Sequence, residues 1–159
     1  MRYNWMILIL LTLIIGTSCV TTKQEPILTD SSKMSDDLFI AASSGNTAEV
    51  RTLLDAGAEV NATYGDGFTA LMAAAMSGNT VTVRVLLDAR AGVNAQTKVG
   101  ATALMWASGK GHPEVAKLLI EKAADVNAQT NIGHTALMIA SQEGQTEIVE
   151  MLKKAGAKE

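Results

Sequence analysis

Residues that commonly carry chemistry are scarce in this chain of 159 residues. It contains one cysteine and two histidines, and aromatic residues make up only 4% of it. A single cysteine excludes both a disulfide within the chain and a metal centre built from several cysteines. A structural zinc site usually has four ligands, so we expect no bound metal. With few aromatics, the core must consist of Ala, Leu, Val, Ile and Met, a set that favours an all-α fold.

Concentrated positive charge and catalytic motifs are also missing. The formal net charge is −3, whereas proteins that bind nucleic acid present a concentrated basic surface. A nucleophilic triad needs a Ser or Cys beside a His that a carboxylate orients, and neither His112 nor His134 stands in such a setting. The chain has no glycine-rich phosphate loop. We therefore expect no enzyme activity, no cofactor and no nucleic-acid partner.

The first eighteen residues have the layout of a secretory signal. Arg2 supplies a positive charge, Met6–Gly16 is an uncharged apolar run of eleven residues, and small residues precede Cys19. A helix that spans a membrane needs about 20 apolar residues, and this run ends sooner. The segment resembles a bacterial lipoprotein signal, although Gly16 stands where leucine is usual. This resemblance implies that residues 1–18 are a signal peptide and that Cys19 carries lipid.

Residues 19–34 would then form a lipidated, polar tether that holds the following domain on a membrane. Two or three acyl chains bind a membrane durably, whereas one chain binds marginally. No aspartate follows Cys19, which favours the outer membrane, facing the periplasm, over retention in the inner membrane; exposure on the cell surface is a further option. Two alternatives stay open: an ordinary signal peptide cleaved near Ser18, and an uncleaved anchor.

The rest of the chain repeats itself every 33 residues. The pattern Gly-x-Thr-Ala-Leu-Met begins at Gly67, Gly100 and Gly133. The same period relates four further glycines and three Val-Asn pairs: Gly45, Gly78, Gly111 and Gly144, and Val60-Asn61, Val93-Asn94 and Val126-Asn127. Agreement at so many positions predicts four units, at about 34–66, 67–99, 100–132 and 133–159.

Each unit predicts two helices and an extended turn. Thr69, Thr102 and Thr135 precede Ala-Leu-Met, and a threonine hydroxyl can accept from the free amides of a helix's first turn. A glycine in the left-handed conformation then ends the first helix, and Pro113 suits the first turn of a second helix. The apolar stripe of the second helices cannot be buried within one unit, so we expect the units to stack as a solenoid.

The repeat resembles the ankyrin family, whose units have this length and a Thr-Pro-Leu-His signature. The resemblance covers residues 34–159 and implies four helix-turn-helix units with β-hairpin-like turns. Apolar packing of Met72, Met105 and Met138 is expected to replace the hydrogen bonds of the signature histidine. Arg90 and Ala123 replace the family's glycine after the second helix, which predicts strain of about 1 kcal/mol or more at each residue if φ is positive there.

The ends of the array and His112 are expected to have structural roles. Met34-Ser35-Asp36-Asp37 replaces the usual start of the first unit, and Lys153 replaces an apolar residue of the last second helix. Polar outer faces keep a solenoid from polymerising, which predicts a complete array of four units and a monomer. His112 is expected to support the turn between two helices.

Positions that differ between repeats indicate where a partner would bind. In the ankyrin family, hairpin tips and first-helix faces form the binding surface. Carried over position by position, the resemblance implies contacts through Asp66, Phe68, Met76, Lys98, Val99, Trp106, Lys110, Asn131, Ile132, His134 and Gln142; Gly65, Ser77, Ala101, Gly109 and Glu143 share these faces. Trp106 could equally pack against its neighbours.

These features together predict a lipid-anchored module of the bacterial cell envelope that binds a protein partner. The alternative is a structural or protective envelope protein that has no dedicated partner. The in-register methionines are expected to serve adaptable packing rather than a cofactor.

Overall fold

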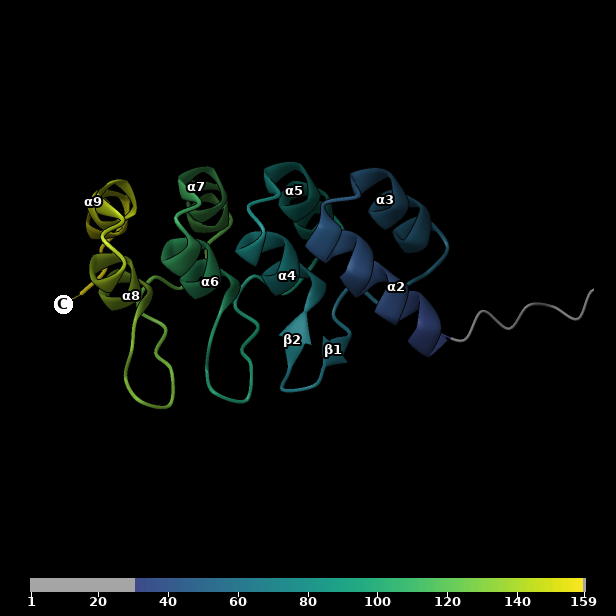
Figure 1. Cartoon of the computed structure of the whole chain (residues 1–159), viewed down its shortest axis with the longest axis horizontal. Coiled ribbons are helices and arrows are strands. Elements are labelled where there is room, and N and C mark those ends of the chain that lie inside the picture. Colours follow the sequence, from purple (N-terminus) through teal and green to yellow (C-terminus); the bar gives the residue numbers. More distant parts are fainter. Residues whose placement is uncertain (1–30, 159) are drawn as a thin grey trace, which may run out of the picture. The chain divides into compact units, whose positions relative to one another are not determined.

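The structure, a computed structural model, describes residues 31–158, and these form four helix pairs (Figure 1). The first helices of the pairs are α2 Ser31–Ser44, α4 Ala70–Met76, α6 Ala103–Lys110 and α8 Ala136–Gln142, and the second helices are α3 Thr47–Asp55, α5 Thr80–Asp88, α7 Pro113–Glu121 and α9 Thr146–Lys154. A short antiparallel pair, β1 Thr63–Tyr64 and β2 Phe68–Thr69, follows the first helix pair. The predicted signal peptide and Cys19 lie outside the described residues.

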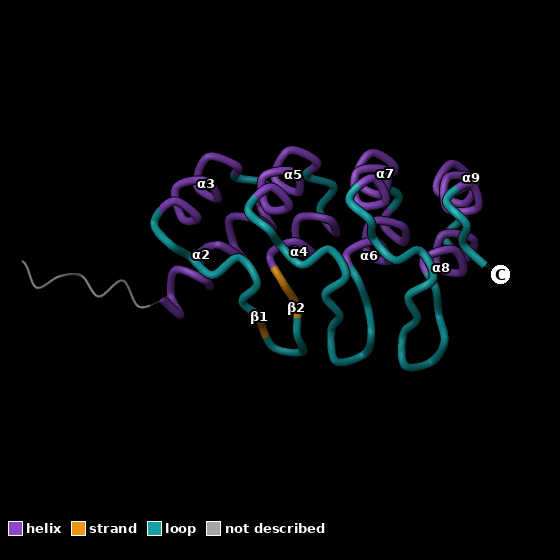
Figure 2. The backbone as a smooth tube through the Cα atoms, turned by 180° about the vertical axis from the view of Figure 1, so that it is seen from behind, coloured by secondary structure: helices purple, strands orange, loops and turns teal. Residues whose placement is uncertain are grey.

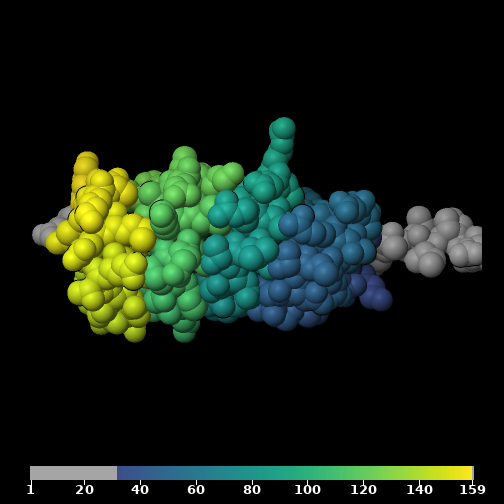
Figure 3. Space-filling model, turned by 90° about the horizontal axis from the view of Figure 1, so that it is seen from above, coloured from purple at the N-terminus to yellow at the C-terminus, as the bar shows by residue number. Residues whose placement is uncertain are grey.

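The helix pairs stack side by side in two layers. Figures 1 and 2 show α2, α4, α6 and α8 in one layer and α3, α5, α7 and α9 in the other, with the connecting loops projecting beyond the first-helix layer. In the space-filling view the repeats follow one another as bands that border only their neighbours (Figure 3). The predicted all-α solenoid is confirmed. No helix within residues 31–158 is long and apolar enough to cross a membrane.

The first helix of the first pair differs from its counterparts. α2 begins at Ser31 and has 14 residues, whereas the other first helices have seven or eight. It therefore includes residues that the sequence assigned to the polar tether. Phe39 on this helix contacts Tyr64 of the first loop, with ring centroids 4.5 Å apart.

Threonine caps begin the other three first helices, as the sequence predicts. The hydroxyl oxygens of Thr69, Thr102 and Thr135 each accept a hydrogen bond from the backbone N–H three residues later, at 3.2–3.3 Å. Each cap satisfies one amide that has no partner within its own helix, which contributes about 1 kcal/mol to the stability of the helix. Pro113 occupies the first turn of α7, where its missing N–H costs little.

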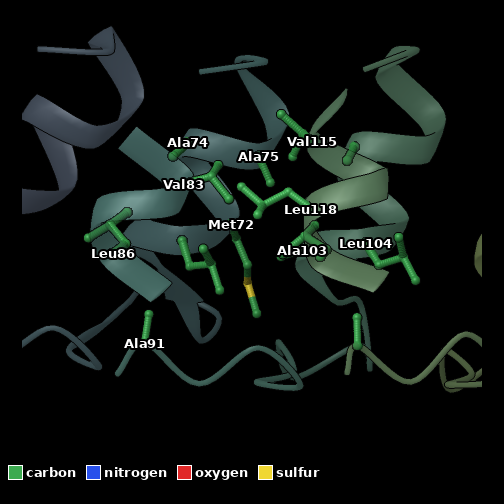
Figure 4. Packing of buried hydrophobic residues seen from close by; sticks show 14 of the residues in the cluster. Met72, Ala74, Ala75, Val83, Leu86, Ala91, Ala103, Leu104, Val115 and Leu118 are labelled. Carbon is green, nitrogen blue, oxygen red and sulfur yellow. The ribbon is translucent and has the colours of Figure 1, made fainter. Parts of the chain in front are cut away.

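The core lies at the seams between consecutive helix pairs. Leu86, Leu104 and Leu119 are fully buried, and burying one leucine side chain contributes roughly 1.5–3 kcal/mol. Figure 4 shows Met72 and Leu118 directed into the space between two neighbouring pairs. Since each seam takes side chains from both of its repeats, every inner repeat depends on its neighbours for its buried surface.

Two of the three in-register methionines pack as expected. Met72 and Met105 are only 0% and 3% exposed, so apolar packing has replaced the polar signature residue there. The expectation is wrong for Met138, which is 37% exposed. Met138 lies on α8, in the last described helix pair, and no further repeat within residues 31–158 covers its side chain.

A side chain from each following repeat lies over the glycine that ends the preceding first helix. Gly78 has φ 75°, and a Cβ there would lie 2.7 Å from ring atoms of His112. Nε2–H of His112 donates to the Met76 carbonyl oxygen, 3.1 Å away. The structural role expected for His112 is therefore confirmed, and its hydrogen bond joins two successive repeats. Asn79 and Gln145 lie over Gly45 and Gly111 in the same way.

Asparagines join the turns of successive repeats. Side-chain oxygens of Asn61, Asn94 and Asn127 accept from a backbone N–H of the next turn at 2.7–2.8 Å. Their Nδ2 groups donate, at 3.3–3.4 Å, to the carbonyls of three residues with positive φ: Arg90, Ala123 and Gly156.

The left-handed backbone anticipated at the two replaced glycines is present. φ is 68° at Arg90 and 63° at Ala123, the two non-glycine residues with positive φ among residues 31–158. Such a conformation costs a residue with a Cβ roughly 1–2 kcal/mol. The asparagine ladder holds the backbone in this form despite that cost.

We expect Arg90→Gly and Ala123→Gly each to raise the free energy of unfolding by about 1 kcal/mol, because removal of the left-handed penalty exceeds the added backbone entropy of glycine. Urea denaturation measures the change. Ala89→Gly is the matched control, because Ala89 has φ −80° and gains nothing from glycine. A loss of stability at all three positions would contradict the assignment of strain.

Gly78→Ala and Gly144→Ala separate the steric effect from the backbone effect. φ is 75° and 70° at these residues, but nothing lies within 4 Å of a Cβ at Gly144. We expect Gly144→Ala to cost about 1 kcal/mol from its backbone alone. Gly78→Ala should cost about 1 kcal/mol more, because the His112 ring must move and lose its hydrogen bond. Equal losses in thermal or urea unfolding would show that the ring adjusts freely.

Candidate protein-binding surface

Backbone hydrogen bonds join the loops of successive repeats into a continuous row. The N–H of Lys98 donates to the carbonyl of Asp66 at 2.7 Å, and one period later the N–H of Asn131 donates to the carbonyl of Val99 at 3.0 Å. Within each of the last two loops a threonine hydroxyl, from Thr97 or Thr130, accepts from a backbone amide four residues later. These bonds hold the loop tips in a defined order along the stack.

The predicted contact residues of the loop tips divide into polar pairs and exposed apolar side chains. Asp66 and Lys98 form an ion pair at 3.3 Å with 77% and 71% of their side chains exposed, so the pair adds little stability. Nδ2 of Asn131 donates to the Lys98 carbonyl at 2.9 Å. Val99 and Ile132 are 57% and 77% exposed. Two apolar side chains one period apart are thus available to a partner.

Phe68, one of the predicted contact residues, packs against the first-helix layer. It is part of β2 opposite Tyr64, is half-buried, and packs on Trp106 with ring centroids 5.2 Å apart. Phe68 thus lies just after the turn at residues 65–67, and part of its side chain is taken up by the contact with Trp106. An aromatic pair of this kind contributes about 0.5–1.5 kcal/mol beyond the area that it buries.

Trp106 combines the two roles that the sequence left open. Its side chain is half-buried and packs on Phe68, and its indole N–H is buried without a hydrogen-bond partner among the described residues. Part of the same side chain lines a hollow on the surface. Trp106 is therefore a scaffold residue that also contributes to a surface on which a partner could bind.

The hollow has a volume of about 360 Å³ and lies where α6 and α8 meet the loop that precedes α6. Of the predicted contact residues it brings together Val99, Trp106 and Lys110. Ile139 was not predicted as a contact residue, although it stands one period after Trp106 and that register could have indicated it. The full lining is Val99, Ala101, Met105, Trp106, Gly109, Lys110, Ile139 and Glu143.

The other predicted contact residues are spread along the surface. Met76 is half-buried, and its carbonyl serves the bond with His112. His134 is half-buried, and its amide donates to the Thr130 hydroxyl at 3.0 Å. Gln142 is exposed and lines a second, shallower region of about 320 Å³ on the last repeat. These residues do not form a single cluster with Val99 and Trp106.

The described titratable residues show no metal-binding group and one shifted pKa, that of Tyr64. Within residues 31–158 there is no group of three His, Cys, Asp or Glu residues placed to hold a metal ion. Burial raises the pKa of Tyr64, and the nearby Asp36 carboxylate raises it further. The phenol therefore stays protonated and neutral in its contact with Phe39.

The family model described as ankyrin repeats (3 copies) matches residues 38–130 and 89–159. The chain therefore belongs to the ankyrin repeat family. Ankyrin repeats generally mediate protein–protein interaction and are typically non-enzymatic. Comparison with curated proteins gives no match.

Proposed function

We propose that this chain is a lipid-anchored ankyrin module that holds a protein partner at the bacterial cell envelope. The partner contacts the row of loop tips and the exposed face of the first helices. The observation that carries this proposal is the placement of Val99 and Ile132, which are 57% and 77% exposed on loops joined by backbone hydrogen bonds.

Exposed apolar side chains at ordered positions favour binding over a purely structural role. Burying a valine or isoleucine side chain contributes roughly 1.5–3 kcal/mol, and the bonded loop row already holds both side chains in place. Binding then costs less conformational entropy than it would if the loops had to become ordered on contact with the partner. The hollow beside Val99 extends this apolar surface toward Trp106.

The anchoring part of the proposal rests on the sequence before the repeats. Cys19 is the one cysteine of the chain and directly follows the small residues that end the apolar run. A diacylated cysteine, with a third acyl chain in many lipoproteins, would keep the module on a membrane. The outer membrane, facing the periplasm, is the proposed site, because no aspartate follows Cys19.

Photo-crosslinking tests the binding surface. Replacing Val99 or Ile132 with p-benzoylphenylalanine in cells should give a discrete crosslinked protein under ultraviolet light. Val81 provides the matched control, since it is an apolar side chain 62% exposed on α5, in the second-helix layer. Identical products at all three positions, or none at Val99 and Ile132, would instead support a structural or protective envelope protein.

Metabolic labelling tests the anchor independently. Cells fed a palmitate analogue should label the wild-type chain and leave Cys19→Ala unlabelled, and the variant should leave the membrane fraction. Cys19→Ala removes the acceptor sulfur and leaves the repeats unchanged, so its far-ultraviolet circular dichroism should match that of the wild type. An unlabelled wild-type chain would refute lipidation, while the crosslinks at Val99 would still report on the binding surface.

A further inference from the structure

A glycine within a helix opens the hollow between α6 and α8. Gly109 lies inside α6, where glycine weakens a helix relative to most residues, and its φ is not in the left-handed range that would require glycine. One period away on either side stand Met76 and Gln142. A Cβ at Gly109 would lie 3.0 Å from Cγ2 of Ile139, so a larger residue would fill the hollow.

A small residue on the loop side opens the hollow further. Ala101 occupies the position that Phe68 fills one period earlier and His134 one period later. In the preceding repeat the Phe68 ring covers Trp106 from one side. Because the Ala101 side chain is only a methyl group, Ile139 and part of Trp106 remain accessible in the hollow.

Opposite charges stand at two sides of this apolar hollow. Lys110, the last residue of α6, and Glu143, next after α8, are one period apart and both exposed. Neither belongs to an ion pair among the described residues, whose ion pairs are Lys98–Asp66 and Lys122–Asp88. An occupant can therefore meet a positive charge on the α6 side and a negative charge on the α8 side without displacing an existing pair.

We propose that this hollow receives one aliphatic side chain from an extended segment of the partner, with an acidic residue two positions to one side of it and a basic residue two positions to the other. The proposal deepens the proposed function and rests on it. Alternate residues of an extended segment face the same way at about 3.3 Å per residue, so the two charges stand about 13 Å apart. The axes of neighbouring helices lie roughly 8–10 Å apart. The long side chains of Lys110 and Glu143 can place their charges farther apart than the axes, at about the 13 Å that separates the two charges of the segment.

The walls of the hollow select an aliphatic occupant. Its apolar lining comes from Met105, Trp106, Ile139 and Val99, and a charged side chain buried there would lose its hydration without compensation. The charges of Lys110 and Glu143 lie at the edge, where they set the register of the flanking residues. Charges at such a rim contribute to specificity more than to affinity.

A blocked peptide of sequence Gly-Glu-Gly-Leu-Gly-Lys-Gly is the probe. The lipidated chain from Cys19 onward, held in detergent, carries 5-fluorotryptophan at Trp106 alone and reports binding by fluorine NMR, with free 5-fluorotryptophan as the chemical-shift reference. The Trp106 resonance should shift to saturation as the probe is added. Serine in place of the probe's leucine should weaken binding at least about 10-fold, from the burial of one leucine side chain.

Two variants locate the occupant. Gly109→Met introduces the residue that stands one period earlier and should weaken binding at least about 10-fold by filling the hollow. Val81→Met places the same side chain on the exposed surface of α5 in the second-helix layer, outside the hollow, and should leave the affinity unchanged. Circular dichroism shows whether both variants keep their helices.

Charge reversal provides a second, surface-only test. Lys110→Glu should weaken binding of the Glu-Leu-Lys probe and strengthen binding of a probe with lysine at both flanking positions. An unshifted Trp106 resonance, equal affinities for Gly109→Met and Val81→Met, or no reversal in Lys110→Glu would overturn the proposal. If crosslinks at Val99 and Ile132 persist in that case, the proposed function stands and only the occupant of the hollow is wrong; absent crosslinks despite probe binding would overturn the proposed function.

Discussion

Contacts from one repeat onto the backbone of the next are what the rest of this structure depends on. Asn61, Asn94 and Asn127 bind both a carbonyl and an amide of the following turn, and the His112 ring reaches back to the carbonyl of Met76. These bonds require a constant spacing between the interacting backbones. The recurrence of the same residues every 33 positions supplies this spacing from one unit to the next.

The same requirement explains why local features were predictable. Thr69, Gly78 and Pro113 act through their own backbone or that of close neighbours, so their roles follow from residue type and position in a helix. The positive φ at Arg90 was likewise foreseeable, because it sits where other repeats carry glycine. Sequence periodicity reports such features directly, since they recur in every unit.

Contacts between positions that are not equivalent in neighbouring repeats could not be predicted from the sequence. Phe68 meets Trp106 across a diagonal between repeats, so comparison of equivalent positions does not reveal the contact. The hollow depends on the joint effect of Gly109 and Ala101 beside Ile139. Exposure of Met138 follows from its place in the last helix pair, whereas its sequence context is that of two buried residues. Three-dimensional neighbourhood, rather than residue type, decides each of these cases.

The last helix pair retains the shape of an internal one. Gly133 and Gly144 have positive φ like their counterparts, yet nothing lies within 4 Å of a Cβ at either residue, and Met138 is partly uncovered. A further unit with the sequence of residues 100–132 would meet on the last helix pair the kind of surface, with its glycine and its methionine, that α6 presents to α8. Lengthening of the gene by tandem duplication would thus require little accommodation beyond Lys153, which stands where inner repeats carry an apolar residue. The last described helix pair therefore offers an added repeat the kind of seam that the inner repeats already use.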